Sequence, residues 1–308
     1  MGAYIARRVL SGLLTLWVVT IVVSLLIHLV PGDPVRIMYA QSQSTTEEQI
    51  EAKRKELGLD RPIYEQYFTY MNNVLHGNFG KTIRGEQPVL NLLLLRLPNT
   101  ILLTVAAMIV AIVVGGSLGF FSAYYRGSWF DTLSMALAIA GIAIPSFWLG
   151  LLLMFFFSVR LGWFPVGGTG LSSLVLPAVT LGLVSAAVLA RLTRSSMLDV
   201  LSQDYLRTAR AKGLSERLVL ARHAVKNSLI PIITMLGLQV AYMLGGAVVV
   251  ENVFAWNGVG RLAVQAILQR DFPMIQGFVL MFAVIVVGVS LAVDVLYAFV
   301  DPRIRYES

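Results

Sequence analysis

A Gly-Lys-Thr triplet at residues 80–82 is the one place where the sequence resembles part of a phosphate-binding loop. Such a loop needs another glycine five positions before the Gly-Lys-Thr, so that the backbone can wrap around the phosphates. That position holds Leu75, and no other Gly-Lys pair is followed by serine or threonine. The sequence therefore predicts that this chain does not bind ATP by this route.

Side chains that could hold a metal or act as nucleophiles are sparse. The chain has no cysteine, which excludes disulfides, thiol catalysis and cysteine metal sites. His28 lies near the end of the first long apolar run, His76 in a polar segment and His223 in a basic one. Because these segments are expected on opposite sides of a membrane, the histidines cannot share a metal, and we expect packing or interfacial roles. No catalytic constellation is present, which predicts a protein that is not an enzyme.

Asp294 is the one acid inside a predicted membrane span. A lone carboxylate is costly there, so it should face other helices and find a partner or water. Its role is either that of a proton-relay carboxylate or that of a structural acid near the cytoplasmic surface. We favour the structural interpretation, because no second intramembrane acid or base completes a relay.

The strongest chemical signature is the basic stretch 205–231 (YLRTARAKGLSERLVLARHAVKNSLIP), in which Glu216 is the only acid. Each arginine or lysine would cost about 2.5–3.5 kcal/mol at the centre of a bilayer. The stretch must therefore face water, and its charge indicates the cytoplasmic side. Its basic residues are Arg207, Arg210, Lys212, Arg217, Arg222 and Lys226.

The stretch predicts two helices joined by a sharp turn. A helix over residues 205–212 ends at Gly213, as helices do at a glycine. Ser215 can cap a second helix that runs to about Asn227, with Glu216 at its positive end. Two interpretations follow: a solvated loop that only fixes topology, or an element that docks into a groove of a partner.

The composition of the chain indicates an integral membrane protein. Of 308 residues, 57% are hydrophobic and only 13% charged, against roughly 25% charged in a soluble domain. The net charge of +7 is scattered over loops, which argues against nucleic-acid binding. Six apolar segments are long enough to cross a bilayer; they cover about residues 9–30, 100–123, 132–159, 174–192, 229–250 and 275–300.

Lysine and arginine counts in the short connections place both termini in the cytoplasm. The fold class is therefore an all-α integral membrane protein of six transmembrane helices, with a small helical extracytoplasmic insertion. We expect cap helices at about 45–57 and 62–75, and a helix at 260–270 in an outside loop. The predicted parts are the N-terminal tip and first span (1–30), the cap (31–96), a five-helix core (97–300) that contains a basic loop (193–228), and a cytoplasmic tail (301–308).

Several residues inside the spans suggest packing or a passage. Small residues at 115, 116 and 119, and at 245 and 246, are typical of close helix contacts. Pro145 and Pro177 are expected to interrupt the third and fourth spans, in regions of tight packing or as hinges. Gln239, Tyr242 and Met243 are candidates for lining a translocation path, although such a stripe also fits an ordinary bundle core.

The sequence of residues 207–213, Arg-Thr-Ala-Arg-Ala-Lys-Gly, resembles the coupling loop of binding-protein-dependent ABC importer permeases, in the dipeptide, oligopeptide and nickel family. The general importer loop begins Glu-Ala-Ala; here those positions hold Arg207, Thr208 and Ala209, which fits the peptide branch. The resemblance covers the whole chain. Its other motifs are Pro31-Gly32-Asp33-Pro34, Leu57-Gly58-Leu59-Asp60-x-Pro62, Gly77-x-Phe79-Gly80, Val293-Asp294-Val295-Leu296-Tyr297 and Asp301-Pro302-Arg303-Ile304-Arg305.

The resemblance implies a type I ABC importer permease in a bacterial or archaeal inner membrane. It implies a second homologous permease, two cytoplasmic ATPase subunits that bind ATP and Mg, and an extracytoplasmic substrate-binding protein that docks near residues 251–273. It implies no cofactor on this chain. The residues it assigns to ATPase coupling are Ala209, Ala211, Lys212, Gly213, Leu214, Ser215, Glu216 and Arg217.

The cargo implied by the resemblance is a di- or oligopeptide, with nickel chelates, glutathione or oligosaccharides as alternatives. Two other classes of function stay open. A secondary transporter would need intramembrane charges and an inverted repeat, which the sequence does not show. A membrane scaffold that transports nothing would bind no ATPase.

Overall fold

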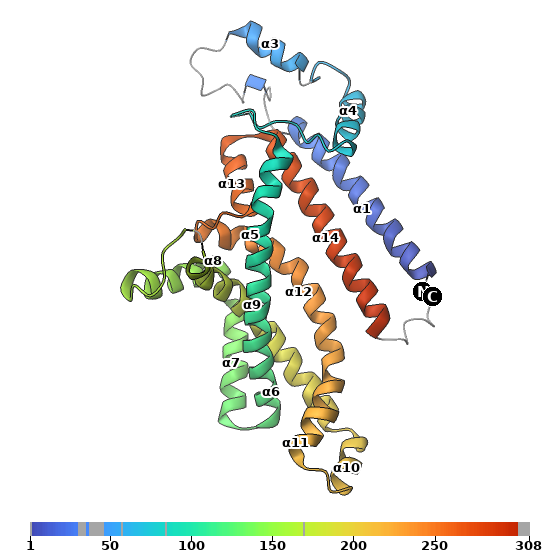
Figure 1. Ribbon diagram of the computed structural model, residues 1–308, viewed down its shortest axis with the longest axis vertical. Coiled ribbons are helices and arrows are strands. Elements are labelled where there is room, and N and C mark those ends of the chain that lie inside the picture. The colour runs from blue at the N-terminus through green and yellow to red at the C-terminus, as the bar shows by residue number, and fades with distance from the viewer. Residues whose placement is uncertain are drawn as a thin grey trace. The chain divides into compact units, whose positions relative to one another are not determined.

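The computed structural model describes residues 2–29, 35–36, 46–56, 58–83, 85–168 and 170–300 (Figure 1). These residues form helices and turns, with one isolated β-bridge between Lys81 and Pro88. Contacts divide the chain into two units. The first unit contains Asn99–Asn257 and the C-terminal residues from Val289; the second contains Gly2–Pro98 and Gly258–Gly288.

Within the described residues, five helices are long and apolar enough to cross a membrane, and a sharply bent helix pair makes a sixth if it counts as one span. The expected all-α membrane fold is therefore confirmed. The five are Ile5–Leu25, Val89–Tyr124, Leu171–Leu201, Pro231–Val253 and Phe272–Val295.

The third expected span is broken rather than straight. Helix α7 (Trp129–Ala143) meets α8 (Ser146–Leu153), which continues as the π-helical segment η2 (Met154–Arg160), at a bend of 107°. Ile144 and Pro145 are extended there, because a residue before proline is driven away from the helical conformation. The interruption expected at Pro145 is confirmed.

The interruption expected at Pro177 is wrong. This residue lies buried inside α9 (Leu171–Leu201), which continues through it. A proline inside a helix removes one backbone hydrogen bond, but Leu176 and Ala178 on either side are buried too. Tertiary packing therefore outweighs the local preference.

The second span begins earlier than expected. Helix α5 (Val89–Val110) continues as π-helical η1 (Ala111–Gly116) and α6 (Ser117–Tyr124), giving 36 helical residues in a row. At about 1.5 Å per residue this run is roughly 54 Å long, far more than the bilayer core requires. The last residues assigned to the cap, from Val89 onward, therefore belong to this helix.

Both helices expected in the cap are confirmed, as α3 (Glu47–Glu56) and α4 (Ile63–Leu75). Gly58 ends α3 with φ of +67°, and α4 is tied to α1 (Gly2–Leu29) by a 3.0 Å hydrogen bond between the hydroxyls of Tyr67 and Thr20. The turn expected at 31–34 and the tail at 301–308 lie outside the described residues.

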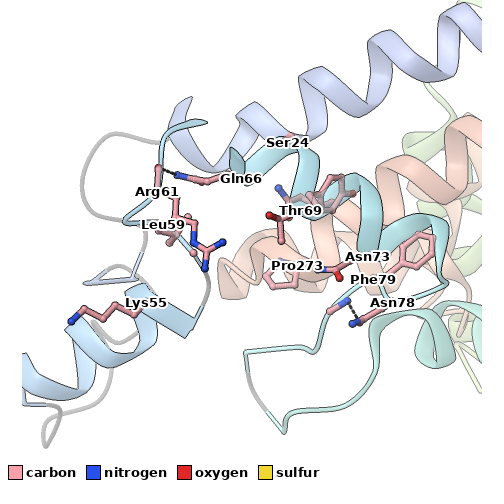
Figure 2. Close-up of a pocket in the computed structure, with 14 residues that line it drawn as sticks. Ser24, Lys55, Leu59, Arg61, Gln66, Thr69, Asn73, Asn78, Phe79 and Pro273 are labelled. Carbon is pink, nitrogen blue, oxygen red and sulfur yellow. Dashed lines mark hydrogen bonds between the residues drawn. The ribbon is translucent and has the colours of Figure 1, made fainter. Parts of the chain in front are cut away.

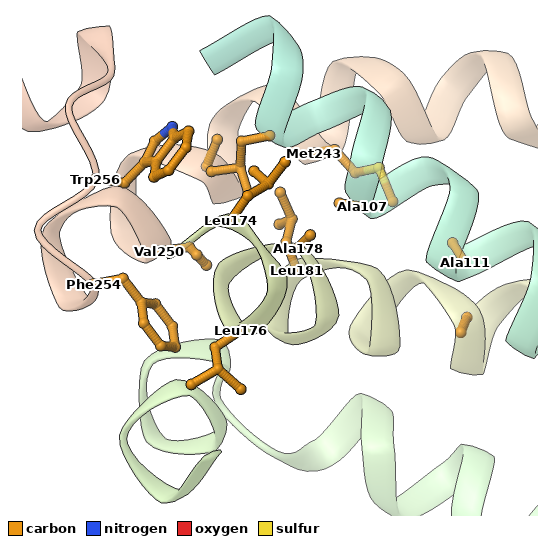
Figure 3. Close-up of a cluster of buried hydrophobic side chains, with 13 residues drawn as sticks. Ala107, Ala111, Leu174, Leu176, Ala178, Leu181, Met243, Val250, Phe254 and Trp256 are labelled. Atoms are coloured by element: carbon orange, nitrogen blue, oxygen red, sulfur yellow. The ribbon is translucent and has the colours of Figure 1, made fainter. Parts of the chain in front are cut away.

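Helix α9 lies at the centre of the first unit, where it contacts η1, α6, α7, α8 and α12 (Val225–Val253). Figure 3 shows Ala107, Leu181 and Met243, from α5, α9 and α12, gathered in one buried cluster. Phe254 and Trp256, which follow α12, close the cluster at one end. This cluster fixes the positions of three candidate spans relative to one another.

Glycines allow the closest helix approach in the first unit. A Cβ on Gly115 would lie 2.4 Å from the Ala186 carbonyl oxygen, and one on Gly119 would lie 2.4 Å from that of Ala190. Close packing at these two positions is confirmed. At Gly116 and Gly245 a Cβ would meet nothing within 4 Å, so the close-packing interpretation is wrong there; Gly246 approaches only Leu181.

The second unit joins α13 (Val259–Gln269), the first half of α14 (Phe272–Val300) and the start of α5 around Val89, Leu93 and Met274. The Asp271 carboxylate between α13 and α14 accepts hydrogen bonds from the backbone N–H groups of Ile83 at 3.0 Å and Met274 at 3.2 Å. The helix expected at 260–270 is confirmed as α13.

Candidate functional site

A sharp turn ends α10 (Asp204–Ala211) in the middle of the basic stretch. The Gly213 N–H donates to the Arg210 carbonyl at 2.9 Å, and the Leu214 N–H donates to that of Ala209 at 3.4 Å. These two bonds form a Schellman motif, which requires a left-handed residue after the helix. Gly213 has φ of +81°, so its expected role as a helix terminator is confirmed.

After the turn, the chain enters one continuous helical run. It consists of α11 (Glu216–Leu218), π-helical η3 (Val219–Ala224) and α12. Ser215 occupies the N-cap position, but its side chain makes no capping hydrogen bond; its backbone carbonyl accepts bonds from the N–H groups of Leu218 and Val219. The expected end near Asn227 is wrong, because burial of Ser228 and Ile232 holds the helix across Pro231. The turn therefore lies at the start of a continuous helical run that includes the fifth span.

An ion pair bridges the turn. The Arg210 guanidinium donates from Nε to Glu216 Oε2 at 3.0 Å and from Nη2 to Oε1 at 2.9 Å. This bidentate hydrogen bonding lowers the pKa of Glu216 below its usual value of 4.5. The pair joins the last turn of α10 to the first turn of α11.

The inner side of the turn is anchored by apolar packing. Leu206 and Val219 are fully buried and Ala209 nearly so, and they share a cluster with Met197 near the end of α9. The Asn227 side chain also donates to the Tyr205 hydroxyl at 2.9 Å. These contacts therefore attach the turn to the ends of α9 and α12.

The structure places seven of the eight predicted coupling residues on one exposed surface, while Ala209 is buried beneath them. Leu214 is 37% exposed although it is apolar. A projecting apolar side chain flanked by charges suits contact with another protein. We call this exposed surface the coupling turn; its residues are Ala211, Lys212, Gly213, Leu214, Ser215, Glu216 and Arg217.

A buried ion pair lies in the same unit, and sequence reasoning missed it. Arg194 of α9 donates from Nε to Asp131 Oδ1 at 2.6 Å and from Nη2 to Oδ2 at 2.8 Å. The Asp131 carboxylate also accepts bonds from the Ser122 hydroxyl and from the Gly127 N–H at 3.0 Å. It is only 5% exposed. These contacts clamp the connection between α6 and α7 onto α9.

One local signal for Asp131 is present in the sequence. Ser128 caps α7, and its hydroxyl accepts a hydrogen bond from the Asp131 N–H at 3.2 Å. A serine followed three residues later by an acid is typical of a helix start. The partner Arg194 is 63 residues away, and no local pattern identifies it.

The candidate passage-lining residues do not share a surface. Gln239 is buried, with its side-chain amide 3.4 Å from the Ser185 carbonyl, and Met243 is buried in the cluster of Figure 3. Tyr242 is 69% exposed. Only Tyr242 is accessible as a passage requires, and the role of all three stays a prediction.

The interpretation of Asp294 as the one acid in a span is wrong. Glu251, assigned to an outside loop, lies fully buried in the last turn of α12, where it accepts a hydrogen bond from the Thr100 hydroxyl at 2.5 Å. Nearby, the Trp256 indole donates to the Asn99 carbonyl at 3.0 Å. Asp294 is half-buried in α14, and its structural role stays a prediction.

The other side chains with possible chemistry are separated. His76 ends α4 with Nδ1 at 2.7 Å from the Asn72 carbonyl, and His223 lies in η3; His28 lies in α1. No group of three side chains that could hold a metal occurs in the described part of the chain. In the Gly-Lys-Thr triplet, the Thr82 hydroxyl accepts a bond from the Gln87 N–H at 3.1 Å, which closes a turn.

Glu216→Gln is expected to loosen the coupling turn. The ion pair contributes fully above the usual glutamate pKa and is lost as pH falls through the lowered pKa of Glu216 in the folded chain. Because both side chains are more than a third exposed, solvent screens the pair to at most about 1 kcal/mol. Amide hydrogen exchange at Leu214 and Ser215 should accelerate up to about fivefold at pH 7. Equal acceleration at a pH well below 4.5 would contradict this.

Comparison with known proteins shows which family this chain resembles. Residues 115–306 match the family described as "Binding-protein-dependent transport system inner membrane component", and residues 1–104 match its N-terminal family. The glutathione transport system permease proteins GsiC of Escherichia coli (strain K12) and Shigella dysenteriae serotype 1 (strain Sd197) are each 44% identical over 305 residues. The match covers 99% of this chain and of each relative.

Solved structures show the same fold. The inward-facing MetNI methionine ABC transporter matches with a TM-score of 0.57 at 18% identity, over 68% of this chain and 96% of that one. An amino acid ABC transporter crystallised with histidines matches with a TM-score of 0.55 at 16% identity, over 68% and 94%. The chain therefore belongs to the inner-membrane permeases of binding-protein-dependent ABC importers, in their peptide and nickel family.

Proposed function

We propose that this permease subunit forms half of a passage for small peptides across a bacterial or archaeal inner membrane. A second homologous permease forms the other half, and two ATPase subunits dock on the coupling turn. An extracytoplasmic binding protein delivers the cargo. Both termini and the coupling turn face the cytoplasm, and ATP and Mg bind to the partners while this chain binds no cofactor.

The observation that carries this proposal is the continuous helix from the coupling turn into the fifth span. The turn is exposed and held by the Arg210–Glu216 pair, and its inner side is fixed to α9 by Leu206. A force on the turn therefore moves the ends of α9 and α12 together. Nucleotide-driven closure of the ATPases would in this way tilt the spans between inward-open and outward-open states.

The cargo is proposed as a di- or oligopeptide, and the second candidate is glutathione. The relatives at 44% identity are glutathione transport permeases, and glutathione is itself a tripeptide, which keeps both candidates in one chemical class. Uptake of labelled dialanine and labelled glutathione by the whole transporter in liposomes distinguishes them. Uptake that requires a proton gradient rather than internal ATP would favour a secondary transporter. Isolation without any ATPase would favour a scaffold.

Gly213→Val is expected to abolish ATP-driven uptake. A side chain at φ of +81° costs about 1–2 kcal/mol of backbone strain, which shifts the turn out of its docking geometry. Gly162→Val is the matched control, because Gly162 also has positive φ and open space around its Cβ position, but lies far from the turn in sequence. Peptide uptake and ATP hydrolysis are measured for both variants in liposomes. Normal uptake by Gly213→Val would show that the turn does not transmit the force.

A further inference from the structure

A cavity of about 300 Å³ lies in the second unit, between α4, the segments on either side of it, and residues of α1 and α14 (Figure 2). This volume is at the lower end of the range for sites of small organic ligands, about 300–1,000 Å³. The described residues that line it include two cations, Lys55 and Arg61, and no acidic side chain. Most other lining groups are hydroxyls and carboxamides, so the cavity favours a polar anionic ligand.

Arg61 is the cation directed at this space. Figure 2 shows its guanidinium reaching toward the middle of the lining residues, while the amine of Lys55 points away. The backbone carbonyl of Arg61 accepts a 2.8 Å bond from Gln66, which holds the segment against the start of α4. Among the described residues, the Arg61 side chain has no acidic partner within ion-pair distance. Its charge is therefore available to a ligand.

Tyr70 supplies a second, independent sign of a ligand. It lines the cavity, and its hydroxyl oxygen is buried without a hydrogen-bond partner among the described residues. Buried polar atoms are nearly always paired with protein, water or ligand. Burial raises the pKa of Tyr70 to about 12, so this hydroxyl stays protonated.

We propose that this cavity binds the carboxylate end of a small peptide-like solute. The Arg61 guanidinium pairs with the carboxylate, and the Tyr70 hydroxyl donates to it. The Asn73 amide and the Asn78 NH₂ group serve the peptide amides; Asn78 already uses its carbonyl oxygen to accept a 3.0 Å bond from the Gly80 N–H. The class of solute rests on the proposed function, whereas the preference for an anion rests on the cavity alone.

A carboxylate fits better than a phosphate for two reasons. Among the described lining residues, one cation is directed into the cavity, which matches one negative charge rather than two. The carboxamide-rich wall offers both donors and acceptors, which match the N–H and C=O groups of peptide amides, whereas phosphate is mainly a hydrogen-bond acceptor. Because the cap is proposed to lie outside the membrane, this site would hold the solute before it enters the passage.

The test measures binding to the full-length permease, purified in lipid nanodiscs, by calorimetric titration. The probes are dialanine, dialanine amide, glutathione and inorganic phosphate. We expect dialanine or glutathione to bind at least tenfold more tightly than dialanine amide, because the amide lacks the charge that Arg61 recognises. Equal binding of acid and amide, tighter binding of phosphate, or no binding of any probe at millimolar concentration would overturn the proposal.

Two variants locate the binding. Arg61→Gln should weaken dialanine binding about tenfold to a hundredfold, and Tyr70→Phe about tenfold, since each removes a hydrogen bond to a charged group. Lys81→Gln and Tyr64→Phe are the controls, because these exposed cap residues lie outside the cavity lining. Tyr70→Phe removes an unpaired buried hydroxyl, so its thermal midpoint without ligand should not fall. If Arg61→Gln and Tyr70→Phe both bind dialanine with wild-type affinity, the proposed site is wrong.

The outcomes separate this site from the proposed function. If the whole transporter takes up peptide but the cavity binds no probe, only the cavity proposal fails. If the cavity binds dialanine through Arg61 while ATP drives no peptide uptake, the proposed transport function fails and the anion site stands.

Discussion

Asp131→Ala is expected to be among the most destabilising single substitutions in the first unit. It removes the acceptor of four hydrogen bonds and leaves the Arg194 charge without its partner. Breaking one side of a buried ion pair costs about 3–5 kcal/mol. We expect the lower end of this range, because Arg194 keeps 28% of its side-chain surface exposed. Thermal unfolding of the detergent-purified chain, followed by size-exclusion chromatography, measures the loss.

Asp204→Ala is the matched control for this experiment. Asp204 and Arg207 form an ion pair of the same chemistry at 3.5 Å, but their side chains are 93% and 77% exposed. A solvent-exposed pair of this kind contributes little that is measurable. If both alanine variants unfold at the wild-type temperature, the buried pair is not a structural clamp.

A double variant separates the cost of leaving the Arg194 charge unpaired from the cost of losing the other hydrogen bonds to Asp131. Replacing both partners, as in Asp131→Leu with Arg194→Met, removes the buried charges together, which is often neutral or even stabilising. Recovery of stability in the double variant would show that the unpaired arginine caused the loss. Failure to recover would show that the bonds from Ser122 and Gly127 to the carboxylate matter most.

Features encoded locally could be predicted from the sequence. The helix end at Gly213 and the cap helices follow from residues within a few positions of one another. The membrane class follows from apolar runs alone. Seven of the eight predicted coupling residues are exposed together, and all seven lie in the short segment that begins with the last residue of α10 and contains the turn at Gly213.

Features that depend on distant partners could not be predicted. Asp131 pairs with Arg194 and Glu251 with Thr100, and in each case the partner lies more than 60 residues away. Pro145 and Pro177 have the same local preference, yet only Pro145 breaks its helix. The difference lies in the environment, because Pro177 and both its neighbours are buried whereas Pro145 is exposed.

Gly119→Ala is expected to separate two helices of the first unit. The new Cβ would lie 2.4 Å from the Ala190 carbonyl oxygen and 2.6 Å from the Thr193 Cβ, both on α9. Neither atom is the end of a flexible side chain, so α6 or α9 must shift. Overpacking of this kind costs about 1–3 kcal/mol. The measurement is the thermal midpoint of the purified chain, and Gly115→Ala, which meets the Ala186 carbonyl at 2.4 Å, should behave alike.

Gly116→Ala is the control, and its expected effect has the opposite sign. A Cβ there meets nothing within 4 Å, although the residue lies in the same helical run, three positions before Gly119. Replacing a helical glycine with alanine then stabilises by about 0.5–1 kcal/mol through backbone entropy. If the thermal midpoint rises for Gly116→Ala and falls for Gly119→Ala, contact with α9 requires the glycine at position 119. If alanine destabilises both positions equally, contact with α9 is not what requires glycine at 119, and the close-packing account of this surface is wrong.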